Sequence, residues 1–291
     1  MSHMLEIDSN GKAQMFSVRE IPWHSLGTIL LAPPTSAEAI KAAGLDWTVV
    51  KRELYWPKNN PSELVKVENR IALVRSSDET LLSVVSPKYT PLQNIEAFNF
   101  LDPLVASGQA EYVTAGSLSS GTRIWVQVKL LNRSTDVVPG DEVRPFLLVS
   151  NGHDGKNSVQ IMTCYHRVCC NNTLSMALGE GGVVHFWHAG DLVQNIETAK
   201  EKLNLMVAGI DDNLALFNAM RERVLTAEER DGFVAALTDY KAPVSQEGET
   251  GDGEKLERHE VMARAMGMKL NALMETGLGS DLPGVRDSLW G

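Results

Sequence analysis

The pattern of apolar and polar positions changes along the chain, from short alternating runs to long helical ones. Runs rich in valine, leucine and aromatic residues predict strands at 47–50, 53–56, 64–67, 70–75, 81–85, 110–118, 123–131, 146–150 and 158–165. Apolar spacing and capping residues predict helices at 35–43, 91–107 and 171–178, and again from 191 onward. This order indicates an α+β fold with antiparallel β-hairpins flanked by helices and a helical C-terminal part.

The middle of the chain carries the clearest local signals. Two hairpins are predicted, one turning at 119–122 and the other at 151–155. Asn171 and Asn172 follow, and their side-chain oxygens are predicted to cap the next helix. From 196 to 224 apolar residues recur every three or four positions, and Thr226 with Glu229 has the form of a capping box.

Three regions are expected. Residues 1–20 form an N-terminal tail, in which Met1-Ser2-His3-Met4 is typical of a residual expression tag and is excluded from function. Residues 21–190 form an α+β core domain, and residues 191–291 a helical region. Within the latter, 243–254 is predicted to be a mobile acidic linker before a last helix at about 255–275.

Charge and cysteine content narrow the function classes. The net charge of −10 over 291 residues argues against a protein that coats nucleic acid with its whole surface. Residues 195–260 hold 15 acidic against 8 basic residues, so the earlier part can still carry a basic groove. Three cysteines make no disulfide framework, and no apolar run reaches the roughly 18 residues of a membrane span. We therefore expect a cytoplasmic protein with no membrane partner.

Cys164, His166, Cys169 and Cys170 are the residues best suited to metal or thiol chemistry. Their spacing lacks the two separated pairs of most zinc sites, so small buried cysteines are favoured over a metal. Cys170, just before a helix, could instead be a nucleophile with His166 or His153 as base. No orienting acid accompanies them, and the sequence favours a protein that is not an enzyme.

Other candidate motifs have simpler explanations. The segment 151–156 lacks the alternating acids of a calcium loop and reads as a hairpin turn. No GxxxxGK[ST] loop is present, so no nucleotide cofactor is predicted. His185 and His188 are close enough to share a ligand, although aromatic packing near a helix start explains them as well.

Basic residues interleaved with aromatic ones indicate a nucleic-acid surface, because rings stack on bases while cations neutralise phosphates. The candidates are Lys51, Arg52, Trp56, Arg123, Trp125, Lys129, Lys156, Arg167, Asn171 and Asn172. Alternation places Arg123, Trp125 and Lys129 on one strand face, opposite an aliphatic one. The alternative is a polar outer sheet face with a tryptophan packed against a helix.

Several segments resemble the phage/plasmid-like protein family catalogued as domain-of-unknown-function family 932. They are Pro22-Trp23-His24-Ser25-Leu26-Gly27, Leu45-Asp46-Trp47, 86–94 (SPKYTPLQN), Thr114-Ala115-Gly116-Ser117-Leu118, His153-Asp154-Gly155 and 167–174 (RVCCNNTL). In the last, Cys169 stands at a usually valine-like position. The resemblance covers most of 20–290 and implies a mobile-element origin without a settled activity.

The predicted helix–hairpin–hairpin–helix order of 91–178 is similar to the core of phage single-strand annealing proteins, which bind DNA in a basic groove as oligomers. We therefore expect a non-enzymatic, homo-oligomeric factor that binds and anneals single-stranded DNA in recombination. The alternative is a protein-interaction factor that acts against host defence through a host protein.

Overall fold

The computed structural model describes residues 4–60, 62–179, 183–188, 192–238, 265–270 and 272. Backbone contacts divide the chain into two units, residues 1–134 with 144–211 and residues 135–143 with 212–291. The first unit holds most of the strands, and the second holds a small hairpin and helices. The predicted α+β class is confirmed, whereas the division predicted after residue 190 stays a prediction.

A seven-stranded sheet forms the centre of the first unit, in the order β12-β11-β10-β7-β6-β1-β2. Its strands are β1 (Met15–Val18), β2 (Thr28–Leu30), β6 (Ala110–Leu118), β7 (Arg123–Leu130), β10 (Phe146–Gly152), β11 (Val159–Cys164) and β12 (Val184–Phe186). All pairs are antiparallel except β1 with β2. Both predicted hairpins are present. The sequence did not predict β1, β2 and β12, because strands of three or four residues show too few alternations.

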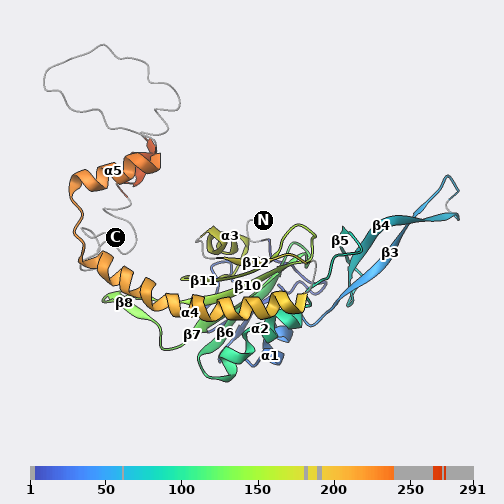
Figure 1. Ribbon diagram of the computed structural model, residues 1–291, viewed down its shortest axis with the longest axis horizontal. Coiled ribbons are helices and arrows are strands. Elements are labelled where there is room, and N and C mark those ends of the chain that lie inside the picture. The colour runs from blue at the N-terminus through green and yellow to red at the C-terminus, as the bar shows by residue number, and fades with distance from the viewer. Residues whose placement is uncertain are drawn as a thin grey trace, which may run out of the picture. The chain divides into compact units, whose positions relative to one another are not determined.

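Helices cover both faces of this sheet. Helices α1 (Ser36–Ala42) and α2 (Asn94–Ala106) lie on one face, where α2 contacts β6, β7 and β10. Helix α3 (Asn171–Gly179) lies on the opposite side and contacts β11 (Figure 1). The face of β7 that carries Trp125 is therefore not an outer face. Trp125 is fully buried in a core cluster with Leu148 and Leu174, which corrects the prediction that its ring is available to bases.

The helix ends test the capping predictions. Thr35 and Glu38 form the capping box of α1, as predicted. Helix α3 begins at Asn171 itself, and the hydroxyl of Thr173 accepts the N–H groups of Cys169 and Cys170. The prediction that Asn171 or Asn172 caps this helix is therefore wrong. The side chain that binds the backbone at the start of the helix is that of Thr173, which lies inside the first turn.

A three-stranded sheet, in the order β3-β4-β5, belongs to the same unit. It comprises β3 (Val49–Pro57), β4 (Leu64–Arg75) and β5 (Leu81–Val85). The four short strands predicted in this region join into two long ones, with a register shift between Glu53 and Tyr55. β3 and β4 extend as a long ribbon away from the seven-stranded sheet (Figure 1). We call this ribbon the arm, and its side chains Tyr55, Trp56 and Leu64 are exposed.

The second unit contains the hairpin of β8 (Thr135–Val138) and β9 (Asp141–Val143), the end of α4 (Leu192–Glu222), and α5 (Ala227–Thr238). Arg221 of α4 donates to the carbonyl oxygen of Val137 in this hairpin. Thr226 and Glu229 form the predicted capping box of α5. The predicted linker 243–254 lies outside the described residues, as does most of the predicted last helix, of which 265–270 are helical.

None of the helices in the described ranges contains a stretch long and apolar enough to cross a bilayer.

Candidate functional site

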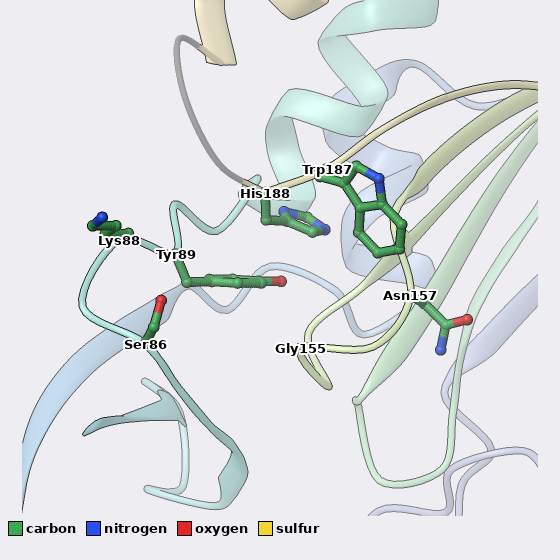
Figure 2. A pocket seen from close by; sticks show the side chains of 7 residues that line it. All are labelled: Ser86, Lys88, Tyr89, Gly155, Asn157, Trp187 and His188. Atoms are coloured by element: carbon green, nitrogen blue, oxygen red, sulfur yellow. The ribbon is translucent and has the colours of Figure 1, made fainter. Parts of the chain in front are cut away.

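Three segments that are far apart in the sequence enclose one small cavity of about 130 Å³ in the first unit. The turn after β5 contributes Ser86, Lys88 and Tyr89, the β10–β11 turn contributes Gly155 and Asn157, and the segment after β12 contributes Trp187 and His188. Figure 2 shows the rings of Tyr89, His188 and Trp187 around this space, which we call the aromatic pocket.

The β10–β11 turn is held in a single conformation by Asp154. Its carboxylate accepts the N–H groups of Lys156 and Asn157 and the side-chain amide of Asn157. Burial acts to raise the pKa of Asp154, but these hydrogen bonds outweigh it and hold the pKa below its usual value. Gly155 has a φ of +71°, and a Cβ there would lie 2.7 Å from Cγ1 of Val85. A glycine therefore lets the turn pack against the end of β5.

Tyr89 and His188 form the rigid wall of the pocket. Their rings stack with centroids 4.7 Å apart, and the Tyr89 hydroxyl donates to the carbonyl oxygen of Gly152 at 2.9 Å. Burial, aided by the charge of Asp154, raises the pKa of Tyr89, so this hydroxyl stays protonated. Thr90 and His188 also pair through the backbone, with Thr90 N 2.8 Å from His188 O.

The hydrogen bonds of His188 define its tautomer. Nδ1 lies 3.2 Å from the carbonyl oxygen of Thr90, which only accepts, so Nδ1 carries the proton. Burial lowers the pKa of His188, although the Thr90 carbonyl and the Asp154 charge oppose it, and the ring is neutral at pH 7. Nε2 is then a lone-pair acceptor, and it is buried with no hydrogen-bond partner among the described residues.

A buried polar layer lies beneath the pocket. His153 is fully buried, its ring packs edge-on against Trp47, and its Nε2 lies 2.9 Å from Oδ1 of Asn94. The Asn94 amide in turn donates to the carbonyl oxygens of Leu45 and Trp47. Burial lowers the pKa of His153 to about 3, with a smaller contribution from repulsion by His188 when that ring is protonated. This layer joins the β10–β11 turn to α2 and to the chain that enters β3.

Exposed lysines surround the aromatic pocket. Lys88 lines it, Lys156 lies between the lining residues Gly155 and Asn157, and Nζ of Lys51 donates to the carbonyl oxygen of Pro87 at 3.3 Å. Two of these three, Lys51 and Lys156, were predicted from the sequence. Asp154 is the carboxylate in the turn itself, and its oxygens face the N–H groups of that turn. Three exposed lysines therefore belong to, or contact, the segments that line the pocket with three rings.

The other predicted residues lie elsewhere. Arg52 and Trp56 are exposed on the arm. Arg123 is paired in register with Gly152 at the pocket end of the sheet, but its guanidinium binds Ser150 and Gln160. Arg167 bonds to Val18 and Glu20, at the β1 side of the sheet. Lys129 lies opposite Glu111 in the β6–β7 pairing. The ten candidates therefore do not line a single groove.

The pocket's aromatic residues were not predicted as binding residues. Tyr89 and Lys88 belong to the 86–94 segment, which the sequence marked only as part of a family resemblance, and His188 was noted only as a partner for His185. The sequence signal available was the run of two histidines and two aromatic residues at 185–188, HFWH.

The cysteine segment is built around Gln127. Its buried amide donates to Sγ of Cys164 and to the carbonyl oxygen of His166, and its Oε1 accepts the N–H of Val168. Nε2 of His166 donates to the carbonyl oxygen of Thr173 at 2.8 Å, which directs this ring to the backbone. Among the described residues, no group of three or more His, Cys, Asp or Glu is placed to hold a metal.

The two adjacent thiols differ electrostatically. Burial raises the pKa of Cys169 to about 11, which disfavours its thiolate. For Cys170, burial also acts to raise the pKa, but hydrogen bonds from Thr173 and the Trp23 side chain outweigh it and lower the pKa. Cys170 is nevertheless completely buried, so a substrate has no access to it in this structure.

We expect Gln127→Leu to lower the free energy of unfolding by about 2–4 kcal/mol, because the buried N–H of Val168 loses its acceptor. The carbonyl of His166 and Sγ of Cys164 lose the Gln127 amide as a donor. Urea denaturation measures the change. Gln109→Leu, at an exposed position, is the control, and equal losses in both variants would contradict the structural role of Gln127.

Comparison with known proteins gives one match. The family model described as domain of unknown function (DUF932) matches residues 81–291, which include all of the pocket-lining residues. No curated protein and no solved structure matches the chain.

Proposed function

Because the chain belongs to the family described as domain of unknown function (DUF932), which assigns no activity, we propose a function from the geometry. The protein binds single-stranded nucleic acid without catalysing a reaction, and it anneals complementary strands as a homo-oligomer. The single observation that carries this proposal is the set of lysines 51, 88 and 156 around the aromatic pocket. A role in phage or plasmid recombination remains an expectation from the family resemblance.

The chemistry of the site supports this proposal. Proteins that bind single strands combine cations that follow the phosphates with aromatic rings that stack on bases. Trp187 is 60% exposed and lines the same pocket as Lys88 and Tyr89, so the site offers both rings and a cation. In a chain with a net charge of −10, such a site is local, and phosphates are attracted to it rather than to the whole surface.

The order of elements also supports it. From α2 through the β6–β7 and β10–β11 hairpins to α3, the chain runs helix, hairpin, hairpin, helix, the order predicted from the sequence. The β8–β9 hairpin is inserted between the two main hairpins. The likeness to annealing proteins is one of topology, so the residues of the pocket carry the functional argument.

We expect the triple variant Lys51→Ala, Lys88→Ala, Lys156→Ala to lower the salt dependence of binding to a labelled single-stranded oligonucleotide. Each lost phosphate contact reduces the slope of log affinity against log salt by about 0.7, so three contacts reduce it by about 2. The measurement is a salt series by fluorescence anisotropy, with the mass of the protein and of the complex recorded in parallel.

The matched control replaces Lys12, Lys41 and Lys202, which are exposed and change the net charge by the same amount. An equal change of slope in both triple variants would show that net charge, rather than the pocket, governs binding. Absence of binding by the wild type at low salt would overturn the proposal and favour a protein partner. Annealing itself is tested by mixing complementary strands with the protein, without nucleotide or metal.

A further inference from the structure

We infer that the aromatic pocket takes up a single unpaired base and prefers bases that carry an exocyclic amino group. This inference rests on the proposed binding of single strands and adds a specificity to it. Its basis is His188, which is 3% exposed and lines the pocket, and whose Nε2 has no hydrogen-bond partner in the part of the chain that the structure describes. A buried acceptor left unpaired is unfavourable, and a ligand that donates to it removes that cost.

Two fixed polar atoms face this part of the pocket, and both are acceptors. Nε2 of His188 has only a lone pair, because Nδ1 holds the proton against the carbonyl of Thr90. The Tyr89 hydroxyl gives its proton to the carbonyl of Gly152, so its remaining capacity is also to accept. In Figure 2 the far end of the His188 ring and the hydroxyl of Tyr89 point the same way, toward the side of Trp187 and Gly155.

Two side-chain donors that line the pocket lie away from these acceptors. The amide of Asn157 gives one of its two protons to the carboxylate of Asp154, and Figure 2 shows the end of this side chain turned away from Tyr89. Ser86 lies at the backbone end of the Tyr89 ring, opposite the hydroxyl of Tyr89. The side chain of Lys88 extends away from the His188 ring in the same view, toward the rim. An amino group, which offers two protons, therefore fits the pair of acceptors, whereas a carbonyl oxygen meets two lone pairs.

Trp187 is the movable wall of the site. Nε2 of His188 is shielded from solvent, and the far end of its ring points toward Trp187 (Figure 2). Trp187 is 60% exposed, so its ring has solvent on one side into which it can turn. Rotation of this side chain opens a path to His188, and the indole face then stacks on the base that enters.

Cytosine and uracil provide the sharpest comparison, because they share a pyrimidine ring and differ only at positions 3 and 4. Cytosine has an amino group with two protons at position 4, whereas uracil has an acceptor oxygen there and a single N–H at position 3, so only cytosine can donate to both acceptors from one group. We expect the wild-type protein to bind an oligodeoxycytidine about three- to tenfold more tightly than an oligodeoxyuridine of equal length, the range of one net hydrogen bond. Binding is measured at mildly alkaline pH, where cytosine is unprotonated.

His188→Phe tests the atom responsible. Phenylalanine keeps a ring against Tyr89 but has no acceptor, so affinity for oligodeoxycytidine should fall to that for oligodeoxyuridine, which should not change. Trp187→Ala, at an exposed position, should weaken binding of both strands equally. Circular dichroism checks that each variant is folded. The comparison of the two oligonucleotides with the wild-type protein tests the preference even if a variant does not fold.

The outcomes separate the inference from the proposed function. Strand binding with equal affinity for the two oligonucleotides overturns the amino-group preference and leaves single-strand binding in place. A preference that persists in folded His188→Phe overturns the assignment to His188. No binding of either strand at low salt overturns both.

Discussion

Trp125→Ala is expected to lower the free energy of unfolding by about 3–5 kcal/mol, the usual cost of deleting a large aromatic side chain from a core. Trp125 has no exposed surface, and it packs among Met15, Leu148 and Met162 beneath α3. Gly116 packs directly against the same ring, since a Cβ there would lie 2.3 Å from it. Glycine has no side chain that could move into the cavity left when the ring is removed. Urea or thermal denaturation measures the loss.

Trp56→Ala is the matched control for this variant. Both tryptophans were predicted to stack on bases, but Trp56 is 56% exposed on the arm. We expect its replacement to change stability by less than about 0.5 kcal/mol. Folded Trp125→Ala should bind an oligonucleotide as the wild type does. Similar losses of stability in the two variants, or a selective loss of binding in Trp125→Ala, would contradict the core position of Trp125.

Acidification is expected to destabilise the protein already at pH values well above those at which carboxylates titrate. The ordinary pKa of histidine is 6.5, and that of His153 in the folded protein is about 3. Below pH 6.5 the unfolded chain therefore takes up a proton that the folded chain excludes, so stability is complete above that pH and falls as the pH approaches 3. The slope for one such group is about 1.4 kcal/mol per pH unit, or roughly 2–3 kcal/mol by pH 4.5.

His188 contributes in the same direction, because burial lowers its pKa as well. Carboxylates with lowered pKa, such as Asp154, add their effect only at lower pH. Urea denaturation at several pH values above 4.5 thus isolates the histidines. The amide of glutamine can donate to Asn94 as the imidazole does. His153→Gln is therefore expected to make the free energy of unfolding depend less on pH. An unchanged slope in this variant would show that His153 is not the group responsible.

The acid response also bears on the site. His153 and Asn94 support the β10–β11 turn that carries Gly155 and Asn157 into the aromatic pocket. We expect loss of this buried layer to weaken the contacts that hold the β10–β11 turn against α2, and so to disturb the pocket. Oligonucleotide binding is therefore expected to decrease with stability below pH 6.5, despite the general gain in positive charge.

Local features were predictable from the sequence. The capping boxes of Thr35 and Thr226, the two central hairpins and the order of α2 to α3 depend on residues within a few positions of one another, or on adjacent strands. The α+β class followed from the same periodicities. Strand β1 could not be predicted, because it pairs with β6, nearly a hundred residues later, and β2 in turn pairs only with β1 among the described strands.

The site was only partly predictable. Lys51 and Lys156 were selected as cations near aromatic residues, a property of composition that needs no fold. The pocket itself depends on bonds between segments that are 63 residues apart, as for Tyr89 with Gly152, or 98, as for Thr90 with His188. Sequence motifs identify each of these segments, but they do not show that the segments come together in the fold.

The sequence by itself determined which residues alternate on β7, and it placed Trp125 and Lys129 on one face and Val126 and Val128 on the other. Only the tertiary structure decided that both faces are covered, one by α2 and the other by the cluster that includes α3. The physical reason is that alternation records which residues share a side of a strand, whereas burial depends on what packs against that side. The aromatic pocket has the same origin, because packing of β5 against the β10–β11 turn brings its residues together.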